Sequence, residues 1–220
     1  MFDPGSRVRL KPTTARLFTA DTLFDRVARA LCEADCLPRK ELYESWQVAR
    51  RTRRRFRGGR VVDLACGHGL VAYLMLLLDG SSPSAIGIDK RIPQSAARVS
   101  EAMVQAWPRL RGRVTLIEGA IEALPLDKRD VVVSTHACGA LTDVVLSRAV
   151  AAQARVVVLP CCHDEGTCDA GDLDGWVDAP LAIDVTRARL LAASGYAVHT
   201  QLLPEDVTPK NRLLLAEPAG

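Results

Sequence analysis

A length of 220 residues, with 48% hydrophobic and 25% charged residues and a formal net charge of +3, is typical of a globular chain rather than a disordered one. This length is enough for one domain with a sizeable core. No apolar run approaches the ~20 residues that span a bilayer, and MFDPGSRVRLKP lacks the apolar segment of a signal peptide, which predicts a cytoplasmic protein. The seven cysteines are not spaced like a secreted disulfide framework, so we expect reduced thiols.

Two helices are predicted before the main fold. Leu23, Val27 and Leu31 recur at helical spacing within residues 19–36. A second helix begins after Pro38 and ends before the glycine pair at 58–59. We interpret residues 1–59 as an N-terminal helical extension or lid, and residues 60–220 as the main domain.

The end of the second helix is rich in arginine. The segment RRTRRRFRGGR, Arg50–Arg60, holds seven arginines in eleven residues. One interpretation is a solvated helix end and loop, and the other is a patch that binds phosphate groups. The second interpretation makes RNA the expected partner, bound through Arg50–Arg60.

From residue 60 onward, strand-like runs alternate with helical stretches. The runs cover residues 61–65, 84–89, 113–119, 130–135 and 155–160, and a helix at 182–194 precedes two more runs at 196–204 and 212–218. Continuous valine and isoleucine runs indicate strands that are buried on both faces. The alternation predicts a Rossmann-like, doubly wound α/β fold with a seven-stranded, mostly parallel sheet. Only a short segment separates the last two runs, so we expect an antiparallel C-terminal strand.

The stretch VVDLACGHG, residues 61–69, is the most specific motif. A strand runs into Gly67-His68-Gly69 and a helix follows, which suits a ligand that approaches the backbone closely and binds free N–H groups. Two cofactors compete for this turn. A loose G-x-G-x-x-A pattern, with Asp89 placed for ribose hydroxyls, is typical of dinucleotide binding.

The fuller string D-x-x-C-G-x-G, followed by the acidic end of the next strand in GIDK, resembles class I S-adenosylmethionine-dependent methyltransferases. The stretch GAIEALP, residues 119–125, is similar to the adenine-pocket segment of that family, with Ala120 in place of the usual acidic residue. The resemblance implies S-adenosylmethionine as cofactor and the class I fold. It implies a cofactor-binding set of Asp63, Ala65, Cys66, Gly67, Gly69, Asp89, Lys90, Ala120, Ile121, Ser134 and His136.

Two polar segments follow the fourth and fifth predicted strands: STHACGALTD at 134–143 and PCCHD at 160–164. Ligands of open α/β sheets bind outside the carboxyl ends of strands, so these segments are expected to face the methyl acceptor. A zinc site, a Cys–His nucleophile and a pocket wall are the alternatives. Cys161 and Cys162, adjacent on an extended chain, are expected to point to opposite sides, which favours the pocket wall and predicts no metal.

Within that class, H-x-C-G-x-x-T-D and C-C-H resemble the family that 2′-O-methylates the tRNA acceptor stem. The resemblance implies one wall with His136, Cys138, Gly139, Thr142 and Asp143, and a facing wall with Cys161, Cys162 and His163. It makes His136, His163, Cys161, Cys162 and Asp143 the catalytic candidates. One of the two histidines is expected to orient or deprotonate the acceptor.

Three hypotheses follow. The first is an S-adenosylmethionine-dependent methyltransferase acting on RNA, at a ribose or base of tRNA or rRNA. The second keeps the enzyme and replaces the substrate by a small metabolite or peptide. The third is a non-catalytic partner subunit that retained the fold.

Overall fold

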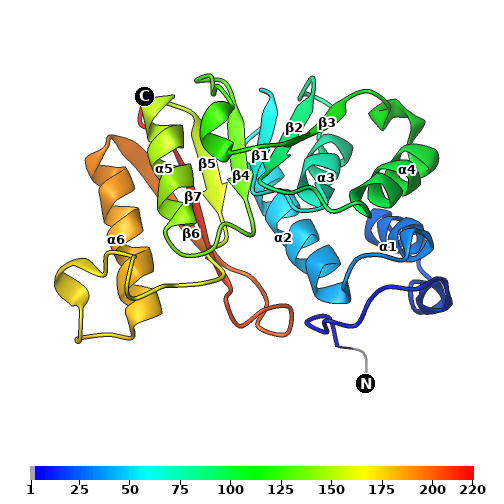
Figure 1. Cartoon of the computed structure of the whole chain (residues 1–220), viewed down its shortest axis with the longest axis horizontal. Coiled ribbons are helices and arrows are strands. Elements are labelled where there is room, and N and C mark those ends of the chain that lie inside the picture. Colours follow the sequence, from blue (N-terminus) through cyan, green and yellow to red (C-terminus); the bar gives the residue numbers. More distant parts are fainter. Residues whose placement is uncertain (1–2) are drawn as a thin grey trace.

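The computed structural model describes residues 3–220, which form one seven-stranded sheet of order β3-β2-β1-β4-β5-β7-β6 (Figure 1). The strands are β1 (Val61–Leu64), β2 (Ala85–Asp89), β3 (Val114–Glu118), β4 (Val131–Ser134), β5 (Arg155–Val158), β6 (Tyr196–Leu202) and β7 (Arg212–Pro218). The α-helices are α1 (Leu23–Ala34), α2 (Arg39–Arg55), α3 (Leu70–Leu78), α4 (Ala96–Ala106), α5 (Leu141–Ala151) and α6 (Ala179–Ala193). Short 3-10 helices cover η1 (Pro12–Leu17), η2 (Pro108–Leu110), η3 (Ile121–Ala123) and η4 (Gly171–Leu173).

The strand pairing confirms the predicted doubly wound sheet. Strands β1 to β5 are parallel, whereas β7 is antiparallel to both β5 and β6. The chain goes from β1 outward to β2 and β3, then returns to β4 on the other side of β1. This reversal of strand order places the topological switch point at the carboxyl ends of β1 and β4, where open α/β sheets bind ligands.

Alternate residues of the central strands enter two separate apolar cores, because successive strand side chains point to opposite faces. Val131, Val133 and Val157 belong to the core that α2 and α3 cover. Val132, Val156 and Val158 belong to the core beneath α5 and α6. Figure 1 shows α1 to α4 grouped away from α5 and α6.

The N-terminal helices share the core of the main fold. Buried residues of α1 and α2 lie in the same apolar cluster as α3 and the strand β1. Helix α2 has 17 residues, so at 1.5 Å per residue it is about 25 Å long. Helix α2 begins near the carboxyl end of β1, where Glu41 reaches His68, and ends near the amino end of β1. Within residues 3–220, no helix has both the length and the apolar character needed to cross a membrane.

Candidate functional site

The turn between β1 and α3 has an unusual backbone. Ala65, Gly67 and Gly69 all have positive φ angles, of 57°, 52° and 71°. A left-handed conformation at a non-glycine residue costs on the order of 1–3 kcal/mol and is concentrated at ligand sites. A Cβ built at Gly67 would meet no atom within 4 Å, so open space adjoins the turn. Gly69 is the N-cap of α3 and offers no side-chain cap, which leaves the N–H groups of that helix end for a ligand.

Two aspartates lie beside this turn. The carboxylate of Asp89, at the end of β2, accepts hydrogen bonds from the backbone N–H groups of Gly67 at 2.9 Å and Arg91 at 3.2 Å. Asp63 is only 1% exposed, and neither of its carboxylate oxygens has a hydrogen-bond partner among the described residues. Burial, followed by the charges of Asp89 and Glu41, raises the pKa of Asp63 to about 8. The nearby N–H of Ala72 does not complete a hydrogen bond of normal geometry and offsets only part of this rise.

These charges define the ligand that the turn favours. The charges of Asp89 and Glu41 disfavour ionisation of Asp63, whose buried carboxyl has no hydrogen-bond partner among residues 3–220. A cation with N–H groups removes both penalties. S-adenosylmethionine fits this requirement, because it carries an ammonium and a sulfonium charge, and its ribose hydroxyls can donate to Asp89. When bound, it supplies a methyl group that the sulfonium charge has already activated.

Two further residues, Glu41 and His68, lie at this site and were not predicted from the sequence. The imidazole Nε2 of His68 lies 2.9 Å from the hydroxyl of Ser95, and Nδ1 lies 3.4 Å from a carboxylate oxygen of Glu41. The side chains of His68 and Glu41 are each 16% exposed. The N-terminal extension therefore contributes Glu41 to the candidate site at the glycine turn. Helical periodicity gave no signal for Glu41, because its partner lies 27 residues further along the chain.

The predicted adenine-side residues gather at the end of β2. The N–H of Gly119 donates to the carbonyl of Asp89 at 2.8 Å, which brings η3 beside β2. Ala120 is exposed, and within residues 3–220 its N–H donates no hydrogen bond. Ile121 is buried and Lys90 is exposed. The adenine contact that was assigned to the backbone of Ala120 or Ile121 stays a prediction compatible with this arrangement.

The polar side chains at the end of β4 and in the loop after it differ in whether they have hydrogen-bond partners. The hydroxyl of Ser134 donates to the carbonyl of Leu64 at 2.6 Å and ties the ends of β4 and β1 together. Thr142 donates to the carbonyl of Ala137 at 2.7 Å and braces the loop. The imidazole of His136 makes no hydrogen bond or ion pair within the described part of the chain, so its ring nitrogens remain available to a ligand.

The cysteines of the two loops converge. The Sγ atoms of Cys138 and Cys161 are 3.3 Å apart, and those of Cys161 and Cys162 are 3.8 Å apart. The expectation that Cys161 and Cys162 point to opposite sides is wrong. Side-chain alternation requires an extended strand, whereas β5 ends at Val158 and both cysteines lie in the following loop.

His163 and Asp143 belong to an ion-pair network on α6. The His163 Nε2 lies 2.8 Å from a carboxylate oxygen of Asp184, and this histidine side chain is 2% exposed. Arg187 donates to both oxygens of Asp143, at 2.6 and 2.9 Å, while Arg212 donates to Asp184 at 2.7 Å. Burial raises the pKa of Asp184, but the bonds from His163 and Arg212 outweigh it and lower the pKa overall. Both candidates brace α6, and a direct role in catalysis stays a prediction.

The arginine-rich stretch lies at the amino ends of the parallel strands, whereas the glycine turn lies at their carboxyl ends. Arg60 directly precedes β1, and Arg55 pairs at 2.7 Å with Glu217 near the end of β7. Arg53 is buried at 4% exposure, where it donates to the carbonyl of Met75 and the hydroxyl of Ser82. Arg53 is therefore a core residue and unavailable to phosphate groups.

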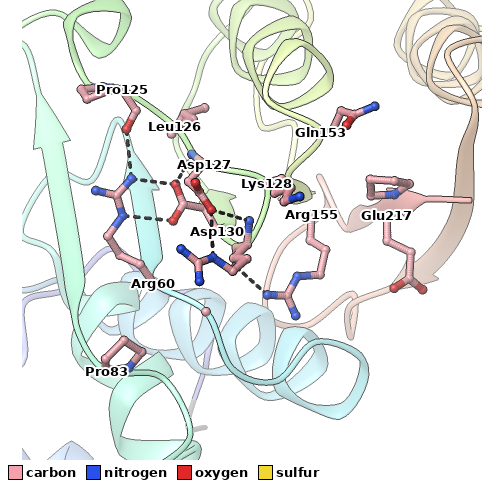
Figure 2. A pocket seen from close by; sticks show the side chains of 13 residues that line it. Arg60, Pro83, Pro125, Leu126, Asp127, Lys128, Asp130, Gln153, Arg155 and Glu217 are labelled. Atoms are coloured by element: carbon pink, nitrogen blue, oxygen red, sulfur yellow. Dashed lines mark hydrogen bonds and ion pairs between the residues drawn. The ribbon is translucent and has the colours of Figure 1, made fainter. Parts of the chain in front are cut away.

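A hollow of about 1050 Å³ lies at the amino ends of these strands (Figure 2). Two of its arginines are held by groups at this end of the sheet. Arg60 donates to both carboxylate oxygens of Asp130, and Arg155 donates to the carbonyl of Arg129 at 2.7 Å. The hollow lies away from the glycine turn, so we do not assign the cofactor to it.

Comparison with known proteins places this geometry in a family. A family model described as a methyltransferase domain matches residues 40–167, more than half of the chain. No curated protein matches the sequence at a significant level. The family match includes the glycine turn, both aspartates, Glu41 and the two cysteine-bearing loops.

Solved structures share the fold at low identity. An O-methyltransferase family protein from Burkholderia thailandensis is 18% identical, with a TM-score of 0.52 over 96% of this chain and 64% of that one. The tRNA methyltransferase TrmK of B. subtilis is 16% identical, with a TM-score of 0.53 over 80% and 65%. Precorrin-6y C5,15-methyltransferase from Geobacter metallireducens is 16% identical, with a TM-score of 0.52 over 78% and 86%.

This chain spans slightly less than two thirds of the first two of those proteins. At these identities the likeness shows the fold alone, and the family match shows the class. The chain belongs to the methyltransferase-domain family, and S-adenosylmethionine is the methyl donor that its glycine turn and carboxylates fit.

Proposed function

We propose that this protein transfers a methyl group from S-adenosylmethionine to a nucleotide of RNA. The RNA substrate is supported by a group of exposed basic residues near the carboxyl ends of the parallel strands, where the glycine turn lies. Arg7 and Lys11 are exposed in the N-terminal segment, and Lys90 and Arg91 are exposed directly after Asp89. Phosphate groups are bound by such cations.

The N-terminal segment is held at this end of the sheet by backbone pairing. The N–H of Leu10 donates to the carbonyl of Leu37 at 2.8 Å, and the N–H of Arg39 donates to the carbonyl of Val8 at 3.0 Å. These partners immediately precede Glu41, whose carboxylate contacts the glycine turn. Arg7 and Lys11 thus border the cofactor site, whereas the predicted Arg50–Arg60 patch lies at the far end of α2.

The far patch has fewer accessible cations than its sequence suggests. Arg53 is buried, and Arg55 and Arg60 have acidic partners. Arg50 and Arg54 are exposed and, within residues 3–220, form no hydrogen bond or ion pair. They suit a distant contact with a long RNA but are too remote to position the acceptor nucleotide.

We assign His136 to the acceptor. It follows β4, next to the switch point, and its imidazole has no protein partner in the described structure. The chain's contribution to the rate is then mainly alignment of the acceptor with the methyl–sulfonium bond. His136→Ala should leave cofactor affinity unchanged in calorimetry while lowering methyl transfer, with the Asp172→Asn variant as a control on an exposed side chain.

The RNA assignment is tested with the full chain, labelled cofactor and total RNA. Binding should weaken steeply with salt, and the Arg7→Glu/Lys11→Glu variant should reduce the slope of log affinity against log salt by about 1.4–1.8 for two lost phosphate contacts. Arg50→Glu/Arg54→Glu, with the same charge change at the far edge, should alter the slope and methylation less. Absence of label in RNA, together with salt-independent binding, would refute the RNA substrate.

That negative result would favour a small acceptor. The solved neighbours include mitomycin 7-O-methyltransferase and a pyocyanin biosynthetic protein. A cavity of about 340 Å³ between α6 and the antiparallel strands is lined by Pro160, which directly precedes Cys161. Its volume suits a small molecule rather than a nucleotide chain.

A further inference from the structure

Three thiols meet at the carboxyl ends of β4 and β5. The Sγ atoms of Cys138, Cys161 and Cys162 all lie within 4.8 Å of one another. Cys138 follows β4, whereas Cys161 and Cys162 follow β5, so the cluster joins two loops that are 23 residues apart in the chain. It is the only group of three or more such metal-ligating side chains found among residues 3–220.

The spacing of these sulfur atoms matches a common metal geometry. A Zn–S bond is about 2.3 Å long, so two thiolates of a tetrahedral zinc site lie about 3.8 Å apart. The Sγ atom of Cys161 lies 3.3 Å from that of Cys138 and 3.8 Å from that of Cys162. Soft thiolate ligands select zinc over magnesium, calcium or manganese. We infer that Cys138, Cys161 and Cys162 bind one zinc ion through three thiolates, with the fourth position left to water or an incoming ligand.

The loops that carry the cysteines are already held in place. The N–H of Gly139 donates to the carbonyl of Cys162 at 3.1 Å, and the N–H of Leu159 donates to the carbonyl of Ser134 at 3.0 Å. Zinc binding therefore needs little rearrangement of the backbone. Cys138 and Cys162 are exposed and Cys161 is half-buried, so the ion has access from solvent.

Proton release is a consequence of this assignment. An ordinary thiol has a pKa of about 8.5 and carries its proton at neutral pH. Zinc binds the deprotonated form, and its binding therefore releases protons to the buffer. The affinity is expected to increase with pH, and the calorimetric enthalpy should change with the ionisation enthalpy of the buffer.

This site goes beyond the proposed function, because metal content can be measured without RNA or methyl transfer. The full chain, purified without chelator, should contain one zinc per chain by plasma mass spectrometry. Replacement of zinc by cobalt should produce a thiolate-to-cobalt charge-transfer band. Each of Cys138→Ser, Cys161→Ser and Cys162→Ser should lower cobalt affinity by at least about a hundredfold, since even residues that only support a ligand cost about 10–100-fold.

Cys36→Ser is the matched control, because Cys36 is half-buried and lies outside the cluster. It should keep both the zinc and the cobalt band. Far-ultraviolet circular dichroism identifies any variant that fails to fold. For such a variant, the comparison of cobalt affinities is replaced by thiol alkylation of the wild-type chain with and without zinc. Zinc should then protect the three cysteines selectively. Copper in place of zinc, a Cys138–Cys161 disulfide in the purified protein, or a cobalt band that survives all three substitutions would each overturn the assignment.

Discussion

Replacing Asp63 by asparagine should change how the stability of the ligand-free protein depends on pH. The pKa of this buried carboxyl rises from 3.8 to about 8 on folding, chiefly because burial disfavours the charged form. Between these values the folded protein keeps a proton that the unfolded chain releases. The free energy of unfolding therefore falls as pH rises through this window, by up to about 1.4 kcal/mol per pH unit and roughly 6 kcal/mol in total.

Asp63→Asn removes this titration. Its free energy of unfolding should change less between pH 4 and 8, and above pH 8 the variant should be the more stable protein. At pH 4 the neutral carboxyl of the wild type and the amide of the variant are both buried without a partner, so the two proteins should have similar free energies of unfolding there. The measurement is a series of urea unfolding curves from pH 4 to pH 9 without cofactor.

Asp172→Asn is the control, because the Asp172 side chain is 90% exposed. Its pH dependence should match the wild type. Cofactor binding gives a second readout, since a bound cation favours the ionised carboxylate. Binding at pH 7 should release protons in the wild type and fewer in Asp63→Asn, with weaker affinity. Parallel stability curves for wild type and Asp63→Asn would refute the reasoning.

Three further substitutions test the site and its support. Asp89→Ala removes the acceptor of the ribose hydroxyls and should lower cofactor affinity by about a hundredfold or more; unchanged affinity in calorimetry would disprove the assignment. Glu41→Gln removes one negative charge near the turn and should weaken cofactor binding about tenfold. Equal cofactor affinities of the variant and the wild type would show that α2 does not contribute to the site. Arg53→Ala removes the nearer cation from the buried Asp79, together with the hydrogen bonds to Met75 and Ser82, while Arg57 stays at 3.8 Å from that carboxylate. It should cost about 3 kcal/mol in urea unfolding, whereas exposed Arg54→Ala should change stability by less than about 0.5 kcal/mol. Similar losses for the two arginine variants would contradict the buried role of Arg53.

The sequence by itself determined the sheet and the glycine turn. Runs such as VVVS and RVVV are apolar on both faces, which predicts buried parallel strands before any contact is known. The glycine turn and Asp89 were also readable, because positive φ angles and helix-end N–H groups follow from residues adjacent in the chain. The resemblance to S-adenosylmethionine-dependent methyltransferases rested on these local features, and the family match confirmed that class.

Only the tertiary structure decided which side chains meet. His68 contacts Glu41 and Ser95, Arg53 becomes a core residue, and His163 turns to Asp184 on α6. These partners are separated by tens of residues, so their contacts depend on where helices and loops cross the sheet, which local periodicity does not encode.

The cysteine loops show the same limit most clearly. Alternation along a strand predicted that Cys161 and Cys162 diverge, but β5 ends before them and the loop brings both thiols to Cys138. Strand and helix formation follow from short-range patterns, whereas a site assembled from several strand ends depends on the chain path after each element stops.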